Sequence, residues 1–186
     1  MSRLQLISPD SATGKTKVLL TAVNAKLGLV PNMTRAMANA PAVLEGYLQL
    51  SGSLGHGVLS PKVREQLALA ISEINGCDYC LAAHSAVGKM VGLTADQIHD
   101  SRLGTAIDPK TDALLRFARK VTEARSRVTS GDLDEVRQAG FDDGAIAETV
   151  AHVALNVFTN YFNNVVETEI DFPQAAGLKT ETAATV

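Results

Sequence analysis

The sequence predicts an all-α fold, and three observations support this prediction. Apolar residues recur at helical spacing along most of the chain, and no stretch shows the strict alternation that is typical of a strand. Aromatic residues make up only 4% of the 186 residues and Trp is absent, so the residue types that favour strands are scarce. Helix start and stop signals also repeat, with Ser or Thr caps, Pro at first helical positions and Gly after last turns.

The first third of the chain predicts three helices. The first covers about Thr16–Leu27 and ends at Gly28, because glycine readily adopts the left-handed conformation that closes a helix. Pro31 and Pro41 have the character of first-turn prolines, since proline fixes φ near the helical value where its missing N–H needs no partner. We expect each of them to begin a short helix.

The clearest helix signal lies in the middle of the chain. Ser60 is a predicted N-cap and Pro61 a first helical residue, and Asn75-Gly76 ends this helix. A second helix runs from about Cys77 to Val91 and stops at Gly92. The apolar face of the first of these two helices consists of Val63, Leu67, Ala70, Ile71 and Ile74.

Further helices follow to the end of the fold. Thr94 and Gln97 have the spacing of a capping box, which predicts a short helix after them. The remaining predicted helices are Lys110–Arg127, Gly131–Gln138 and the longest, Asp143–Thr168.

The length fits one domain with a single substantial core. We expect this domain to span 1–173. The segment 174–186 is rich in Ala and Thr and follows Asp171-Phe-Pro173, so we expect it to be disordered or to lie on a neighbouring subunit.

A faint internal echo relates two parts of the chain. An offset of 83 positions aligns Glu65 with Glu148, and Cys77-Asp-Tyr-Cys80 with Asn160-Tyr-Phe-Asn163. Few identities support this alignment, so chance is a serious alternative. If it is real, the echo indicates a duplicated helix-pair unit whose second copy has lost its thiols.

Charge and hydropathy exclude several classes of function. A net charge of −3 does not supply the positive field that nucleic-acid backbones require. No segment approaches the run of about 18 apolar residues that a membrane helix needs. The start of the chain also has no apolar core of a secretory signal. We therefore expect a cytoplasmic protein that binds neither nucleic acid nor a membrane.

The two cysteines, Cys77 and Cys80, are separated by two residues. Such a pair closes almost no loop and would stabilise little, so in a reducing compartment it indicates a reactive or metal-binding pair. On a helix, these cysteines and His84 share an arc of roughly 60°. The same stripe continues through Val87 and Val91, which indicates that it faces packed protein.

Three effects could activate a thiol on this stripe. The N-terminus of the helix favours a thiolate through its partial positive charge. His84 can accept the thiol proton. A carboxylate could orient the imidazole and take up that proton from it, as in a Cys–His–acid relay. Because the chain folds back at Asn75-Gly76, the preceding helix can supply the carboxylate. Glu65 is our candidate, although helical geometry alone does not separate it from Glu73.

Other interpretations stay open on the residues alone. Glu65 by itself is typical of a solvated surface glutamate, a single His of a packed or capping residue, and the two cysteines of small buried hydrophobes. Two thiolates, an imidazole and a carboxylate would also satisfy zinc, but the second CxxC or His pair of the usual structural site is absent from the sequence. A purely structural helical protein is a further alternative.

One segment is similar to the signature of a known family. It runs from Arg64-Glu65 through Asn75-Gly-Cys-Asp-Tyr-Cys80 to Ala83-His84, and it resembles AhpD-like proteins of the carboxymuconolactone decarboxylase superfamily, especially their peroxidase-related branch. The spacing Glu-x11-Cys-x2-Cys-x3-His matches in full, and similar segments continue to Asp171-Phe-Pro173. The resemblance implies an AhpD-like helical bundle.

The resemblance also implies roles for four residues. Cys80 would be the peroxidatic thiolate, Cys77 the resolving thiol, His84 the base, and Glu65 the acid that relays its proton. Tyr79 stands where well-studied members carry a second histidine, which puts a two-histidine relay in doubt. Of the other histidines, we expect His56 in a turn, His99 on the surface, and His152 in an apolar helix near the site, where a substrate-pocket role is an alternative.

The activity implied by the resemblance is that of a thiol peroxidase without a metal or other cofactor. It would reduce a hydroperoxide, be regenerated by an external dithiol or protein reductant, and assemble as a trimer or hexamer. A thiol–disulfide oxidoreductase with little peroxidase activity is the alternative within enzymes. Decarboxylation or lactone chemistry is disfavoured, because it does not require the CxxC pair.

Overall fold

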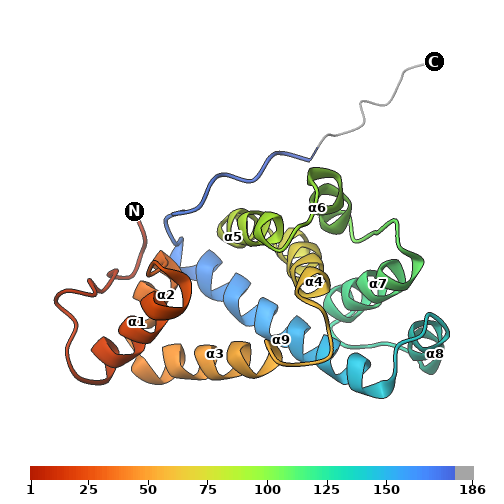
Figure 1. Ribbon diagram of the computed structural model, residues 1–186, viewed down its shortest axis with the longest axis horizontal. Helices are drawn as coiled ribbons and strands as arrows, with labels where there is room; N and C mark the ends of the chain where they lie inside the picture. The colour runs from red at the N-terminus through yellow and green to blue at the C-terminus, as the bar shows by residue number, and fades with distance from the viewer. Residues whose placement is uncertain (179–186) are drawn as a thin grey trace, which may run out of the picture.

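Residues 1–178 are described by the structure, a computed structural model, and they confirm the all-α prediction (Figure 1). Over this range the chain forms helices and no strand. The expectation for the tail concerns 174–186, of which 179–186 lie outside the described residues. In chain order the helices are α1 (Gly14–Leu27), α2 (Asn32–Met37), α3 (Pro41–Leu54), α4 (Pro61–Ile74), α5 (Asp78–Met90), α6 (Ala95–Arg102), α7 (Pro109–Glu123), α8 (Ser130–Gln138) and α9 (Asp143–Val166).

Helix starts follow the predicted caps. The Ser60 hydroxyl caps α4, and Thr94 with Gln97 forms the predicted capping box of α6. Pro41 is the first residue of α3, as predicted, but this helix has 14 residues and is not short. Pro31 lies one residue before α2 as its N-cap, so the prediction that it begins the helix was wrong by one position. In the range 1–178, no helix has both the length and the apolar character to cross a membrane.

Two helices end earlier than predicted. α7 ends at Glu123 rather than at Arg127, because Arg125 and Ser126 have left-handed φ values of 51° and 67°. In α9, the same conformation at Glu167 ends the helix before the predicted position. Non-glycine residues adopt this conformation only when the surrounding structure holds them, so a search for glycine stop signals misses such ends.

The internal echo does not correspond to a second helix pair. α9 runs without a break through Glu148 and Asn160, the positions that align with Glu65 and Cys77. The Glu148 carboxylate instead accepts two backbone N–H groups of the α3–α4 loop, at 2.5 and 3.1 Å. Glu148 therefore closes this loop.

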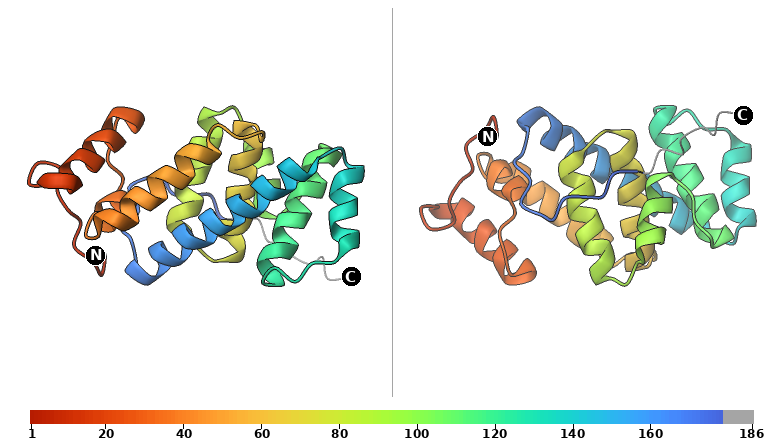
Figure 2. Two further views of the ribbon diagram at one scale, coloured as in Figure 1. Left: turned by 90° about the horizontal axis from the view of Figure 1, so that it is seen from below. Right: turned by 90° about the horizontal axis from the view of Figure 1, so that it is seen from above.

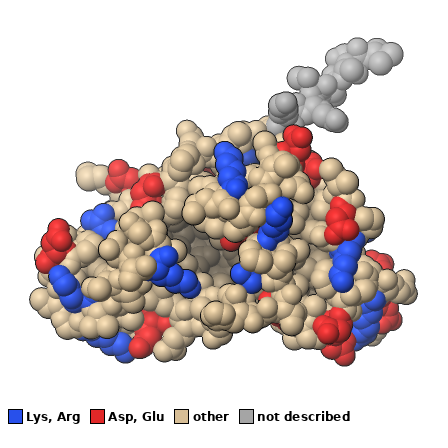
Figure 3. All heavy atoms as spheres, in the orientation of Figure 1, with Lys and Arg blue, Asp and Glu red and all other residues tan. Residues whose placement is uncertain are grey.

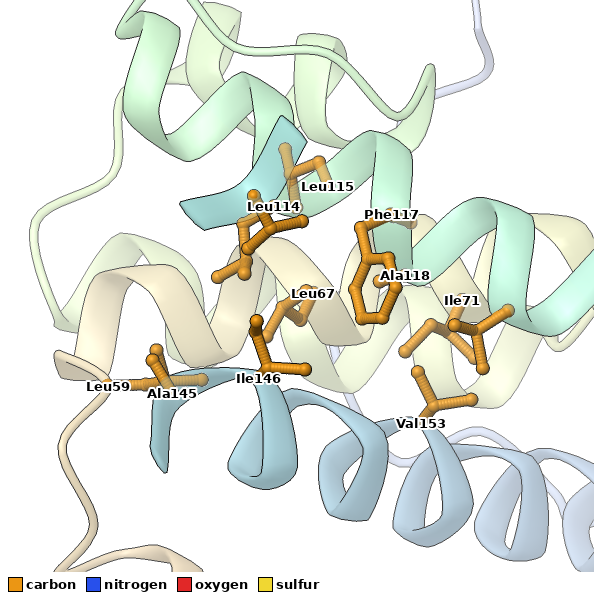
Figure 4. Packing of buried hydrophobic residues seen from close by; sticks show 13 residues of the cluster. Leu59, Leu67, Ile71, Leu114, Leu115, Phe117, Ala118, Ala145, Ile146 and Val153 are labelled. Atoms are coloured by element: carbon orange, nitrogen blue, oxygen red, sulfur yellow. The ribbon is translucent and has the colours of Figure 1, made fainter. Parts of the chain in front are cut away.

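The main core lies where α4, α7 and α9 meet (Figure 4). α4 is central, because it packs against α5, α6, α7 and α9. Since Glu65 lies in the first half of α4, this packing also fixes the position of a predicted site residue. The buried members of the cluster are Leu59, Leu67, Ala70, Ile71, Leu114, Leu115, Phe117, Ala118, Val121, Val136, Ala145, Ile146 and Val153.

Replacing Leu67 with alanine is expected to lower the free energy of unfolding by about 2–5 kcal/mol. Leu67 is fully buried between α4, α7 and α9, so the substitution removes packed methyl groups and leaves a cavity. Val18→Ala is the control, because Val18 on α1 is 67% exposed and its loss should change the value by less than about 0.5 kcal/mol. Urea unfolding followed by circular dichroism measures both, and equal changes would contradict the central position of α4.

The turn between α4 and α5 is held by α9. Gly76 in this turn has a φ of 59°, which a residue with a side chain rarely adopts. Asn160 donates to the Ser72 hydroxyl at 3.1 Å and accepts the Asn75 side-chain amide at 2.9 Å. Asn164 donates to the Asn75 carbonyl at 2.9 Å. These hydrogen bonds tie the start of α5 to the last third of α9.

After α9, the chain returns across α5 (Figure 2, right). Asp171 accepts the Asn32 backbone N–H at 2.7 Å, and so tethers this C-terminal segment to the start of α2. The Phe172 ring meets the Tyr79 ring edge-on, with centroids 5.7 Å apart. Ala175 then packs against the small cluster between α4, α5 and α6. The described start of the tail therefore lies against its own chain.

Candidate active site

α5 begins at the cysteine pair. Cys77 is the N-cap of this helix, and its sulfur accepts the Cys80 backbone N–H at 3.2 Å. The helical turn between the two residues brings their sulfurs together, and in the structure they form a disulfide with an S–S distance of 2.15 Å. The pair can therefore close the bond that thiol redox chemistry requires.

A cavity of about 400 Å³ lies beside the pair. Figure 3 shows this face of the molecule hollowed between α1 and the α4–α5 pair. Cys80 and His84 both line the cavity, whereas Cys77 is fully buried and does not line it. One sulfur of the pair thus faces the cavity and the other is shielded from it. Much of the remaining wall is apolar and includes Val23, Leu27, Pro31, Met33, Leu48 and Phe172.

Glu65 and His84 meet in the wall of this cavity. The His84 Nδ1 lies 2.8 Å from a Glu65 carboxylate oxygen, and the two side chains are 28% and 16% exposed. An ionised carboxylate accepts only, so Nδ1 carries the proton and Nε2 is the nitrogen that can accept another. The pair thus has the geometry of an oriented base one helical turn from Cys80. Glu65 is not the solvated surface residue that its position on α4 alone suggested.

Glu73, the rival carboxylate, points elsewhere. Its carboxylate accepts the Arg102 Nε–H at 2.6 Å and so joins α4 to α6. The structure therefore brings Glu65, and not Glu73, to His84.

Tyr79, which stands at the position of the second histidine, connects α5 to α2. Its hydroxyl oxygen accepts the Met33 backbone N–H at 3.2 Å. Burial raises the pKa of Tyr79, and the neighbouring Asp171 carboxylate raises it further, so the phenol stays protonated. Together with the contact to Phe172, this fixes Tyr79 between α2 and the C-terminal segment.

α9 supplies a polar wall that the sequence interpretation largely missed. Its residues at positions 152, 156, 159 and 163 all line the cavity. The amide of Asn163 donates to the Cys80 sulfur at 3.3 Å. The available signal was a stripe of polar residues at helical spacing, His152, Asn156, Thr159 and Asn163, within an otherwise apolar helix.

The other histidines take different places. His152 is buried in the α9 wall of the cavity, with Nε2 3.6 Å from Glu148. Burial lowers the pKa of His152, which favours the neutral imidazole at neutral pH. His56 is exposed in the turn after α3, as predicted. Among residues 1–178, no group of three or more His, Cys, Asp or Glu side chains is arranged to hold a metal ion.

The sequence comparison identifies a family over the part of the chain that contains the site. The sequence model described as "Carboxymuconolactone decarboxylase family" matches residues 41–124. This range includes Glu65, both cysteines and His84. No match was found among proteins with curated functions.

Comparison with solved structures extends the similarity to most of the chain. A peroxidase-related protein with an alkylhydroperoxidase AhpD core, from Ralstonia eutropha JMP134, is 27% identical, with a TM-score of 0.82 over 91% of this chain and 92% of that one. A peroxidase-related protein from Silicibacter sp. TM1040 is 26% identical, with a TM-score of 0.81 over 90% and 91%.

The debrominase Bmp8 shares the fold at 18% identity, with a TM-score of 0.75 over 91% of both chains. The family match thus covers the segment that carries the cysteine pair, and the structural similarity covers about nine-tenths of the chain. The family match and the two peroxidase-related structures together support the AhpD-like carboxymuconolactone decarboxylase superfamily as the family to which this chain is similar.

Proposed function

We propose that the protein is a thiol-dependent peroxidase that reduces organic hydroperoxides. The observation that carries this proposal is the arrangement of the cysteine pair: Cys80 lines the cavity, and Cys77 is bonded to it from the buried side. A peroxidase needs one accessible sulfur to meet the peroxide and a second within bonding distance to complete the oxidation. The peroxidase-related names of two structural relatives support the same activity.

In the proposed reaction, the Cys80 thiolate attacks the terminal oxygen of the hydroperoxide. The O–O bond breaks, the alkoxide leaves and takes up a proton to become the alcohol, and Cys80 becomes a sulfenic acid. The Cys77 sulfur then attacks the Cys80 sulfur, the S–O bond breaks, and hydroxide leaves as water after protonation. The products are one alcohol, one water and the disulfide, and an external dithiol or protein reductant restores both thiols by exchange.

The Glu65–His84 pair supports both halves of this scheme. With Nδ1 held by Glu65, His84 can take the Cys80 proton on Nε2 before the attack and return it to the leaving oxygen afterwards. The reaction consumes protons at the oxygen atoms and releases them at the sulfurs, so one relay can serve both steps. We propose no metal or other cofactor for it.

The enclosed position of Cys80 favours a peroxidase over a thiol–disulfide oxidoreductase for protein substrates. Cys80 is 3% exposed at a cavity of about 400 Å³, so a disulfide on the broad surface of a folded protein does not reach it. A small hydroperoxide can enter it. A small dithiol, or a narrow segment of a protein reductant, is the regenerating partner that we propose for the same reason.

We also propose a cytoplasmic homo-oligomer, a trimer or hexamer. A reducing compartment would keep the pair ready for peroxide. The outer side of α9 supports a subunit contact, because large apolar side chains stay exposed along it. These are Val150, Phe158, Tyr161 and Val165, with exposures of 44%, 39%, 58% and 68%.

A single-turnover experiment tests the proposed activity. Fully reduced protein, freed of reductant, is mixed with one equivalent of cumene hydroperoxide. We expect about one equivalent of the alcohol and an intact mass lower by two hydrogens, with no sulfinic product, because Cys77 closes the disulfide at once. A protein that keeps both titratable thiols and leaves the peroxide intact is not a peroxidase. Rapid exchange with a small disulfide under the same conditions would then favour the oxidoreductase alternative.

A further inference from the structure

One contact to the candidate nucleophile comes from outside the relay. The Asn163 side-chain amide on α9 donates to the Cys80 sulfur at 3.3 Å, and the same nitrogen lies 3.2 Å from the Met33 sulfur. Asn163 is 2% exposed, so these hydrogen bonds are formed in a buried part of the cavity wall. It is a polar group that the Glu65–His84 scheme does not use.

The orientation of this amide follows from the chemistry of its neighbours. A thioether sulfur and a disulfide sulfur have no proton to donate, so only the NH₂ end of Asn163 can form hydrogen bonds with them. The other end, Oδ1, is buried without a hydrogen-bond partner among the described residues. The amide is therefore poorly satisfied in the disulfide state, since neutral sulfurs are weak acceptors.

Ionisation of Cys80 would change the strength of this contact. A hydrogen bond to an anion is roughly twice as strong as one between neutral groups, and it gains further in a buried site. The amide is also held in place, because the neighbouring Asn160 and Asn164 fix this part of α9 to the α4–α5 turn. Little reorganisation is thus needed when the sulfur becomes charged.

We propose that Asn163 is a catalytic residue whose amide stabilises the Cys80 thiolate and the sulfenate that follows it. This inference rests on the proposed function in taking Cys80 as the sulfur that reacts with peroxide. The Asn163 amide is a hydrogen-bond donor from α9, in addition to the Glu65–His84 relay from α4 and α5. The Cys80 sulfur then has the His84 base on one side and the fixed Asn163 dipole on the other. The Met33 contact keeps the amide in the wall while Cys80 changes state.

The test measures thiolate directly and needs no peroxide. In a Cys77→Ser background, which leaves one thiol, the rate of Cys80 alkylation by iodoacetamide is followed against pH. We expect Asn163→Ala to lower the rate at pH 7 about tenfold and to move the rise of the curve to higher pH, because less thiolate is present. Asn163→Asp keeps the shape but replaces the donor by a negative charge, so its loss should be larger.

Asn24→Asp is the matched control. It makes the same chemical change on an exposed side chain of α1 that does not line the cavity. Its alkylation curve should overlay that of the parent. If Asn163→Asp does not fold, Asn163→Ala still decides the question. A parent-like curve for folded Asn163→Ala overturns the inference, even if the single-turnover experiment shows that the protein reduces peroxide.

Discussion

Replacing Cys80 with serine is expected to reduce hydroperoxide turnover by about 10³-fold or more. A serine hydroxyl does not ionise near neutral pH and does not accept oxygen from a peroxide, so the substitution removes the nucleophile itself. Cys80 is the sulfur of the pair that lines the cavity. The measurement is peroxide consumption at saturating dithiol, for folded protein that shows the parent circular dichroism spectrum.

Cys77→Ser is the informative partner of this variant. It removes the buried sulfur and leaves Cys80 in the cavity wall. We expect it to consume about one equivalent of hydroperoxide and then to accumulate sulfenic and sulfinic acid at Cys80, which peptide mass spectrometry detects. Oxidation at Cys77 in the Cys80→Ser variant, at the rate of the parent protein, would reverse the two roles.

The Glu65→Gln substitution is expected to lower turnover about 10²-fold. Glutamine keeps the shape of the side chain and can still accept a hydrogen bond from the His84 Nδ1–H, but it cannot carry the negative charge that stabilises a protonated imidazole. His84→Asn should cost a similar factor, since it removes the proton acceptor itself. Because the two residues act as one unit, the double variant should be no worse than the more damaged single variant.

Glu73→Gln is the control for this series. It makes the same change on the same helix, at a glutamate that pairs with Arg102. Its rate should stay within about a factor of two of the parent rate, although some stability can be lost with the ion pair. Equal losses in Glu65→Gln and Glu73→Gln, or full additivity of Glu65→Gln and His84→Asn, would show that the 2.8 Å contact is not a relay.

The sequence predicted the helices well because their signals are local. The Ser60 N-cap and the Thr94 capping box depend only on residues a few positions apart, and both caps are present in the structure. The end of α7 depends on left-handed backbone at Arg125 and Ser126, whose N–H groups bond to carbonyls of the last turn, and no glycine marks this end in the sequence. The length of α3 was underestimated, although Gly55 directly follows its last residue as the C-cap.

The candidate site likewise contains residues that local spacing predicts and residues that only the packing of helices brings together. Cys77, Cys80 and His84 lie on one helix, so their spacing was sufficient to place them together. The contact of Glu65 with His84 crosses two helices, and the resemblance to a family, rather than helical geometry, distinguished it from Glu73. Asn163 lies far along the chain, and only the packing of α9 brings it to the sulfur.

The return of the C-terminal segment has a consequence for biosynthesis. Phe172 completes one side of the cavity and Asp171 tethers this segment to α2, and both residues are synthesised long after the cysteines. A nascent chain that ends before them carries both thiols without this part of their enclosure. The pair should then react with any oxidant in the surroundings, and selectivity for substrate is acquired only as translation finishes.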